Sequence, residues 1–358
     1  MKKTIFPSTL IIIILISFSS CKKNKSECLT CPPPPPDTTS HIIQWQMPDT
    51  LGTQGIIRDV WVFDRNNAWA VGEIYLNDST GKLIYPPFNI ARWNGSKWEL
   101  QMSIDIGFSY SQLYSIYAFA QNDVWVTTDI PEHWDGNKWT FYGSTRGYGG
   151  GFWIKKTWGL SSSNLYIVGD GGNIFHFNGI SWTKMNSNTT VDLQDIWDID
   201  GSHIWATGTN TGDGHCVVLQ YNGTNWTTIY DNNTQPSQSQ YGFSCLWTDN
   251  QNQLWLAGGS PLRKLILSTM TFTEIITGQG YVSYCIKGMT QNDIFIAGQA
   301  SECAHYNGSS WHLYPELQNL NGGYAWFYSV HPTKDFVVLG GIYLTALNGF
   351  PVVVRGYR

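Results

Sequence analysis

Apolar and polar positions follow one pattern in a stretch of thirteen residues that recurs seven times along the chain. Each copy reads as an apolar strand, a short polar turn and a second apolar strand, and the copies align without gaps. Such internal repetition indicates structural units that stack on their neighbours, so it bears on the fold before any other feature does. The copies begin at Ile57, Leu113, Ile154, Leu193, Phe243, Ser283 and Trp326.

A third strand follows each copy and closes on a turn, with an aromatic residue four positions beyond the start of the turn. Asn-Gly and Asp-Gly tolerate the positive φ values of a two-residue type I′ turn, so they predict β-hairpins. The fifth unit keeps this spacing with Ser268-Thr269 and Phe272. The other turns are Asn94-Gly95, Asp135-Gly136, Asn178-Gly179, Asn222-Gly223 and Asn307-Gly308, each followed by tryptophan.

Successive turns lie 41, 43, 44, 46 and 39 residues apart. Four antiparallel strands at this spacing are typical of a propeller blade, so the sequence predicts an all-β, seven-bladed β-propeller over residues 41–358. The seventh unit lacks a fourth strand, and Ile42 to Met47 resembles the fourth strand at Lys97 to Met102. We therefore expect the N-terminal strand to complete the last blade, which removes an open sheet edge.

The first twenty residues have the features of a secretory signal: Lys2 and Lys3, then an apolar run too short to span a bilayer. Phe-Ser-Ser before Cys21 resembles a bacterial lipobox, which implies cleavage before Cys21 and lipidation of that residue. The alternative is an ordinary signal peptide with an incidental cysteine. Residues 21–40 are polar and contain Pro32 to Pro36, whose polyproline geometry predicts a stiff tether of roughly 15 Å.

Removal of Lys2 and Lys3 leaves 19 of the 21 basic residues against 26 acidic ones, a net charge of −7. This charge, without a basic cluster, argues against nucleic acid as a partner, and we expect a monomer that meets the membrane only through its lipid. Thirteen of the 18 tryptophans occupy three recurring strand positions, where we expect them to form the core. Cys245 and Cys285 share one position in adjacent blades; a disulfide there is possible, but equivalent side chains tend to face one way, so unbridged cysteines are favoured.

No motif of a known catalytic, nucleotide or metal site is present, and we predict no cofactor. The Asp-x-Asp pair Asp198 and Asp200 is interpreted as a turn of blade four. His133, His176 and His305 recur on separate blades, too far apart to share a metal, and are expected to be solvent-facing.

Loop length gives the one positive indication of function. Turns between strands one and two and between strands three and four are short and lie on one face; the other face carries long loops rich in Gly, Ser, Asn and Tyr. Such loops on a rigid scaffold favour recognition of a partner. The candidate ligand-binding residues are Tyr85, Tyr148, Trp153, Tyr241 and Tyr324.

The blade pattern N-D-x-W-x-x-G followed by N/D-G-x-x-W, with the segments at 37–41 and 72–81, resembles a group of bacterial propeller lipoproteins, some labelled glucosyl transferase. The strands also resemble, more distantly, propeller assembly factors of the photosystem type, which bind other proteins. The resemblance implies a lipid-anchored protein of the bacterial cell envelope, at the outer membrane. We expect it to bind an envelope protein or a glycan on its long-loop face; the alternative is a carbohydrate-active enzyme, for which no motif is found.

Overall fold

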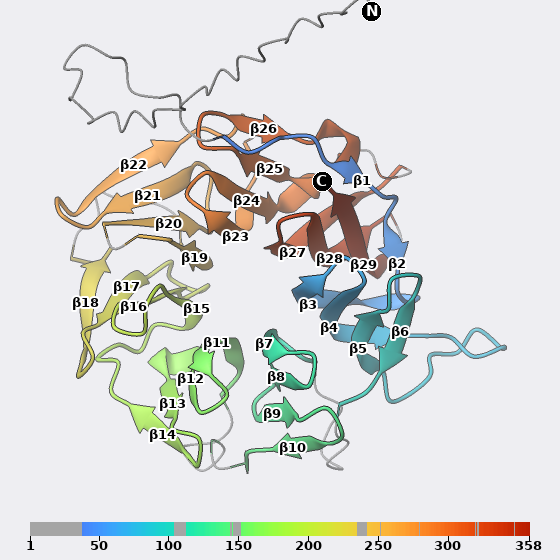
Figure 1. Ribbon diagram of the computed structural model, residues 1–358, viewed down its shortest axis with the longest axis horizontal. Coiled ribbons are helices and arrows are strands. Elements are labelled where there is room, and N and C mark those ends of the chain that lie inside the picture. The colour runs from blue at the N-terminus through green and yellow to red at the C-terminus, as the bar shows by residue number, and fades with distance from the viewer. Residues whose placement is uncertain are drawn as a thin grey trace, which may run out of the picture. The chain divides into compact units, whose positions relative to one another are not determined.

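The computed structural model describes residues 38–103, 112–143, 145, 152–234, 242–250, 252–278, 280–318, 320, 322–346 and 348–358. These residues form seven antiparallel sheets arranged in a ring, which confirms the predicted seven-bladed β-propeller (Figure 1). Among them there is no α-helix, and short 3₁₀ turns lie at Asp170–Gly172, Gln299–Ser301 and Pro315–Leu317. No helix in these described parts is long and apolar enough to cross a membrane.

Each blade runs from its innermost strand outward in chain order. Blades 1 to 3 comprise β3 (Gln54–Asp64), β4 (Asn67–Tyr75), β5 (Phe88–Trp93) and β6 (Trp98–Gln101); β7 (Ser115–Ala120), β8 (Asp123–Thr127), β9 (Pro131–Trp134) and β10 (Trp139–Phe141); and β11 (Ile154–Ser161), β12 (Asn164–Gly169), β13 (Ile174–Phe177) and β14 (Trp182–Met185). Blades 4 to 6 comprise β15 (Leu193–Asp198), β16 (Ile204–Thr209), β17 (Cys216–Tyr221) and β18 (Trp226–Asp231); β19 (Cys245–Trp247), β20 (Gln253–Ala257), β21 (Leu262–Ile266) and β22 (Thr271–Ile275); and β23 (Ser283–Thr290), β24 (Asp293–Gly298), β25 (Cys303–Tyr306) and β26 (Trp311–Leu313).

The seventh blade confirms the predicted closure by the N-terminal segment. Strands β27 (Tyr324–Pro332), β28 (Phe336–Leu344) and β29 (Gly349–Tyr357) are joined by β1 (Gln44–Trp45) and β2 (Asp49–Thr50), which both pair with β29. The closing strand is thus shorter than the predicted Ile42 to Met47 and broken in two. Asp49 secures it, since its Oδ2 accepts hydrogen bonds from Arg355 at 2.8 Å and from the Trp98 indole at 3.0 Å.

The turns between strands three and four lie where the sequence predicts them, but the predicted type I′ geometry is wrong. In the first of them Trp93 pairs with Trp98, and four residues form the loop. Gly95 has a φ of +90°, whereas Asn94 is absent from the residues with positive φ. A type I′ turn would need positive φ at both residues. The Asn94 side chain accepts hydrogen bonds from the backbone N–H groups of Ser96 and Lys97, which holds this turn in place.

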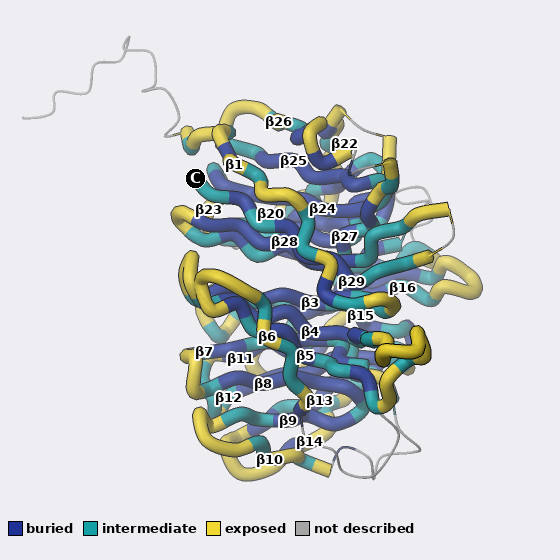
Figure 2. Tube along the Cα trace, turned by 90° about the vertical axis from the view of Figure 1, so that its right-hand side faces the viewer, coloured by how far each residue is buried: buried dark blue, intermediate teal, exposed yellow. Residues whose placement is uncertain are grey.

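The recurring tryptophans are mostly core, as predicted. Trp69, Trp125, Trp205 and Trp255 in the second strands are at most 3% exposed and pack between neighbouring blades. Figure 2 shows the buried residues following the strands and the exposed ones gathered at turns and loops. In the described part of the chain Trp153 is the one tryptophan that is clearly exposed, at 44%.

The long loops predicted on one face are mainly the links between blades. Of the loops between strands two and three, only that of blade 1, residues 76–87, is long; in Figure 1 it projects outward in light blue. The signal sequence and residues 21–37 of the tether, with Cys21, Cys28 and Cys31, lie outside the described residues, as do Tyr148 and Tyr241. The end of the tether contacts blade 6, since the Thr39 hydroxyl donates to the Asn292 carbonyl oxygen at 2.7 Å.

Candidate functional site

A β-bulge shapes the innermost strand in five of the seven blades. The register shifts between Ile57 and Asp59, and the same irregularity recurs between the first and third residues of the repeat in blades 3, 4 and 6. In blade 7 it lies between Phe327 and Ser329, so the seventh copy starts at Phe327, one residue later than predicted. A bulge inserts one residue and re-aims its side chain. The second and third residues of the repeat therefore both reach the propeller axis, at two levels, and build two rings of side chains.

The lower ring consists of the third residue of each repeat, which links neighbouring blades by hydrogen bonds. The Asp59 carboxylate of blade 1 accepts from the Ile116 N–H of blade 2 at 3.1 Å. The same bond recurs four times, with a backbone N–H of one blade donating to the side chain of its neighbour: Thr157 to Ser115 at 3.0 Å, Leu246 to Asp195 at 2.8 Å, Ile286 to Cys245 at 3.3 Å and Val60 to Ser329 at 3.2 Å. A short polar side chain at this position thus satisfies a buried N–H group of the next blade.

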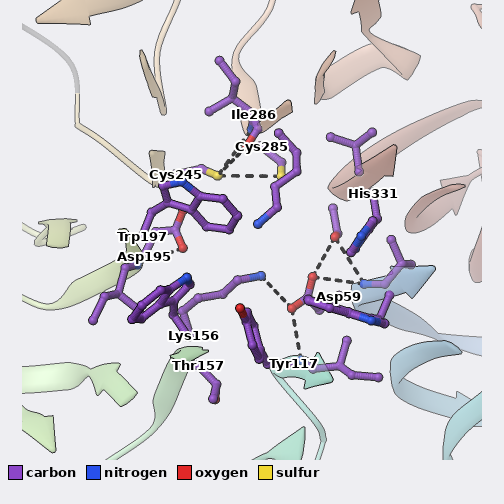
Figure 3. A pocket seen from close by; sticks show the side chains of 18 residues that line it. Asp59, Tyr117, Lys156, Thr157, Asp195, Trp197, Cys245, Cys285, Ile286 and His331 are labelled. Atoms are coloured by element: carbon purple, nitrogen blue, oxygen red, sulfur yellow. Dashed lines mark hydrogen bonds and ion pairs between the residues drawn. The ribbon is translucent and has the colours of Figure 1, made fainter. Parts of the chain in front are cut away.

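Lys156 occupies the same position in blade 3 and cannot accept a hydrogen bond. Its ammonium group instead reaches across the axis to Asp59, with Nζ 2.6 Å from Oδ2 (Figure 3). Burial by itself would raise the pKa of Asp59, but Lys156 and the surrounding donors hold that pKa below its ordinary value. Burial likewise opposes the charge on Lys156, yet Asp59 and then Asp195 raise the pKa of the lysine. Both groups are therefore charged at neutral pH.

Below this ring the axis is filled by side chains. Trp61, Tyr117, Trp197, Lys287 and His331 surround the remaining cavity of about 20 Å³, which has room for roughly one water molecule. The Lys287 ammonium lies 3.5 Å from the centre of the Trp197 ring, and burial followed by repulsion from Lys156 lowers its pKa to about 8. The channel is a polar core of the fold, with room only for a molecule of about the size of water.

The upper ring consists of the re-aimed second residues, and five of them form a continuous arc across five blades. Lys155 Nζ lies 5.0 Å from the centre of the Tyr114 ring, and the Arg58 guanidinium lies 5.4 Å from Tyr114 and 5.3 Å from Tyr328. Tyr328 in turn stacks on Tyr284 at 5.2 Å. All five side chains are half-buried. We call this set, Lys155, Tyr114, Arg58, Tyr328 and Tyr284, the mouth arc.

The mouth arc carries a cation without a carboxylate partner among the described residues. Lys155 is neutralised by Asp170 at 3.2 Å. Arg58, by contrast, has one long hydrogen bond, 3.4 Å from Nη2 to the Gln112 amide oxygen, and its buried Nε has no partner. A guanidinium presents several donors in one plane, which suits a carboxylate. The ring therefore offers an anion-binding group between two tyrosines.

The predicted ligand-binding residues lie at different distances from this arc. Trp153 packs on Tyr114 with ring centres 5.5 Å apart, so it extends the arc outward. Tyr324, 46% exposed, begins β27, on which Trp326 contacts Tyr284 edge to face at 6.4 Å. Tyr85, 62% exposed, lies in the projecting loop of blade 1, where it contacts Tyr75 edge to face, and belongs to a separate part of the surface.

Comparisons with known proteins support the fold. The structure of YCF48 bound to D1 peptide is similar with a TM-score of 0.63 at 14% identity, over 87% of this chain and 96% of that one. The WD40 propeller domain of Doa1 gives 0.58 at 12%, over 88% and 97%. The extracellular domain of the one-component system BT4673 from B. thetaiotaomicron gives 0.54 at 10%, over 86% and 40%. No family model matches the chain, and no curated protein is similar to it in sequence.

The histidines at 133, 176 and 305 are not solvent-facing, contrary to the expectation. Each ring stacks on the aromatic residue of the paired strand, as His305 does on Phe295 at 4.4 Å, and bonds to the residue that begins that strand. Arg92 and Lys264 hold the equivalent place over Trp69 and Trp255. The position selects a flat or cationic side chain because it covers an aromatic face.

The Asp198 and Asp200 pair forms a turn, as interpreted. Asp198 accepts hydrogen bonds from three backbone N–H groups of its own turn, and Asp200 accepts from Ser202 and contacts His203. Within the described residues no group of three or more His, Cys, Asp or Glu side chains is placed to hold a metal ion.

Sequence reasoning missed both axial rings. Part of the signal was available, since the third residues of the first six copies are Asp, Ser, Lys, Asp, Cys and Cys in otherwise apolar strands. In blade 7 the structural register gives this place to Ser329. In the structural register the second residues are Arg58, Tyr114, Lys155, Gln194, Ser244, Tyr284 and Tyr328, and the alternation of a regular strand would assign them to the face opposite the third residues. In five blades a bulge turns this part of the strand.

Proposed function

We propose that this propeller is a binding protein that holds an acidic segment of a partner protein at the mouth arc, on the long-loop face. The observation that carries the proposal is Arg58, a half-buried guanidinium between Tyr114 and Tyr328 with no carboxylate partner among the described residues. Because side chains fill the axis below the mouth arc, we infer that a partner binds this site at the surface of the propeller.

Charge-assisted hydrogen bonds to a carboxylate supply orientation, and the flanking rings supply apolar contact area. Arginine and tyrosine together dominate the energetics of protein interfaces. Trp153 and Trp326 widen the aromatic surface on two sides of the arc. The mouth is lined by single side chains from adjacent blades, which suits an extended chain or a single acidic side chain. A propeller of the same fold, YCF48, has been seen with a peptide bound, which supports a peptide as the class of ligand.

We further propose that Cys21 carries a lipid that tethers the propeller to the bacterial cell envelope, with residues 21–40 as the spacer. The lipobox-like sequence Phe18 to Cys21 and the run Pro32 to Pro36 support this placement. Cys21→Ser should move the protein from the membrane fraction to the soluble fraction of cells. If the variant stays with the membrane, another segment anchors it.

The binding proposal is tested by site-specific photo-crosslinking in cells. A benzophenone amino acid replaces Trp153 beside the mouth arc, and in a parallel strain it replaces Ile180, which is 85% exposed in a turn of the opposite face. We expect a partner protein to crosslink from position 153 and not from position 180. Crosslinking only from position 180 would place the interface on the wrong face.

The affinity of the recovered partner is then measured with matched arginine variants. Arg58→Gln removes a charge-assisted contact and should weaken binding about tenfold to a hundredfold. Arg65→Gln is the control, because Arg65 is exposed in a turn of the opposite face and the two variants have the same net charge. Equal affinity of the Arg58 variant and the wild type would contradict the proposal. If the protein still binds to cells after the cells are treated with protease, and a soluble acidic polysaccharide blocks this binding, the ligand is a glycan instead.

A further inference from the structure

Cys245 and Cys285 occupy the third repeat position in adjacent blades 5 and 6, and their sulfur atoms lie 3.7 Å apart. The expectation that one side chain faces the back of the other is therefore wrong. Both residues are under a tenth exposed, and both line the small axial cavity in Figure 3. A hydrogen bond also connects the two blades here, since the Ile286 N–H of blade 6 donates to Cys245 Sγ of blade 5 at 3.3 Å.

In the hydrogen bond between the two thiols, Cys245 is the donor and Cys285 is the acceptor. The hydrogen bond from Cys245 lowers the pKa of Cys285, burial opposes this effect, and Lys156 lowers that pKa further. The same bond and burial raise the pKa of Cys245. The other two described cysteines lack such help: burial raises the pKa of Cys216 to about 12 and that of Cys303 well above its ordinary value. Reactivity toward oxidants follows thiolate character, so Cys285 is the most nucleophilic of the four.

We propose that Cys245 and Cys285 form an oxidisable dithiol that hydrogen peroxide converts into a disulfide between blades 5 and 6. The cavity beside the sulfurs has a volume of about 20 Å³, which admits a molecule of roughly the size of water. Hydrogen peroxide is only slightly larger than water, whereas a glutathione disulfide does not fit. The site therefore selects a small peroxide over bulky disulfide reagents.

The reaction balances with peroxide as the only oxidant. The Cys285 thiolate attacks one peroxide oxygen, the O–O bond breaks, and the other oxygen leaves as hydroxide and takes up a proton to give water. This leaves Cys285 as a sulfenic acid. The Cys245 sulfur then attacks the Cys285 sulfur, the S–O bond breaks, and a second water leaves. Two thiols and one peroxide thus give one disulfide and two waters, and the sulfurs close from 3.7 Å to about 2.05 Å.

The test uses the purified mature chain, reduced and then exposed to hydrogen peroxide. After quenching, denaturation in an alkylating reagent blocks the remaining thiols for mass spectrometry. We expect a loss of two hydrogens and a peptide pair that links residue 245 to residue 285, with Cys216 and Cys303 still alkylated. Oxidised glutathione in the native state should give at most a tenth of this rate.

Two variants separate the steps. Cys245→Ser should halt the reaction at a sulfenic acid on Cys285, which a dimedone-type reagent captures after unfolding. Cys285→Ser should lower the rate of peroxide consumption at least tenfold. The oxidation rates of Cys216, Cys245, Cys285 and Cys303 in the wild type test the same proposal without a substitution. Absence of the 245–285 link, or oxidation of Cys216 and Cys303 at the same rate, would overturn the proposal.

Discussion

Lys156 Nζ lies 2.6 Å from Asp59 Oδ2, although the two residues are 97 positions apart and come from blades 3 and 1. The contact passes the inner strand of blade 2 and joins two charges that each sit in a ring of side chains at the axis. Asp59 also accepts from the Ile116 N–H at 3.1 Å and from the Ser329 hydroxyl at 2.7 Å. One carboxylate therefore connects blades 1, 2, 3 and 7.

This arrangement predicts that Asp59 is more sensitive to truncation than to amide substitution. Asp59→Ala leaves the Lys156 ammonium and a backbone N–H without partners, so it should cost about 3–5 kcal/mol of the free energy of unfolding. Asp59→Asn keeps one acceptor oxygen and should cost less. Urea denaturation measures both values. Equal stability of the alanine variant and the wild type would show that the axial ion pair does not support the fold.

The blade-linking hydrogen bonds predict a graded effect at Ser115. Ser115→Ala leaves the buried Thr157 N–H unsatisfied and should cost about 1–3 kcal/mol. Ser115→Cys should cost less, because Cys245 already accepts the corresponding bond from the next blade at 3.3 Å. Ser163→Ala, in a turn between strands one and two, serves as the control and should change stability by less than about 0.5 kcal/mol. An alanine variant at 115 that matches the control would contradict the role of the ring.

Glu302 predicts a pH dependence of stability. Its side chain is 1% exposed, Oε2 accepts from Ser283 at 2.9 Å, and Oε1 has no partner among the described residues. Burial raises its pKa from 4.5 to about 7. The folded state therefore keeps a proton that the unfolded chain releases, so this contribution to stability is complete below pH 4.5 and is lost as the pH rises to 7.

Glu302→Gln removes this titration. The stability of the wild type relative to this variant should fall by about 2.5 kcal/mol between pH 5 and pH 8. Chemical denaturation of both proteins at the two pH values measures the difference. A difference that stays constant with pH would show that the carboxyl group is not held protonated by burial.

The exposed aromatic residues at the long-loop face predict a loss of binding without a loss of stability. Trp153→Ala and Tyr324→Ala should each weaken partner binding by about 2 kcal/mol, roughly thirtyfold. Both side chains are close to half exposed, so the melting temperature should stay within a few degrees. Tyr85→Ala is a matched control, because Tyr85 contacts Tyr75 edge to face in the projecting loop, outside the mouth arc. Thermal unfolding beside a binding titration distinguishes the two effects.

The fold could be predicted from the amino-acid sequence. Strand alternation, glycines and turn residues recur with similar spacing in each repeat. Each repeat can bury its apolar faces only against the neighbouring repeats. The blade number, the closure by the N-terminal segment and the burial of the recurring tryptophans follow from that spacing. The exposure of Trp153 and Tyr324 could also be predicted, since both residues fall outside the repeated core positions.

The chemistry at the axis, by contrast, depends on how the blades pack together. A regular strand would place Arg58 and Asp59 on opposite faces, and the bulge between Ile57 and Asp59 brings both to the centre at different levels. Which charges meet there depends on the curvature of the closed ring, because Asp59 and Lys156 are not in adjacent blades. The approach of the Cys245 and Cys285 sulfurs to 3.7 Å has the same origin. Local sequence sets each strand, whereas the closure of the ring sets the distances between side chains that share one repeat position.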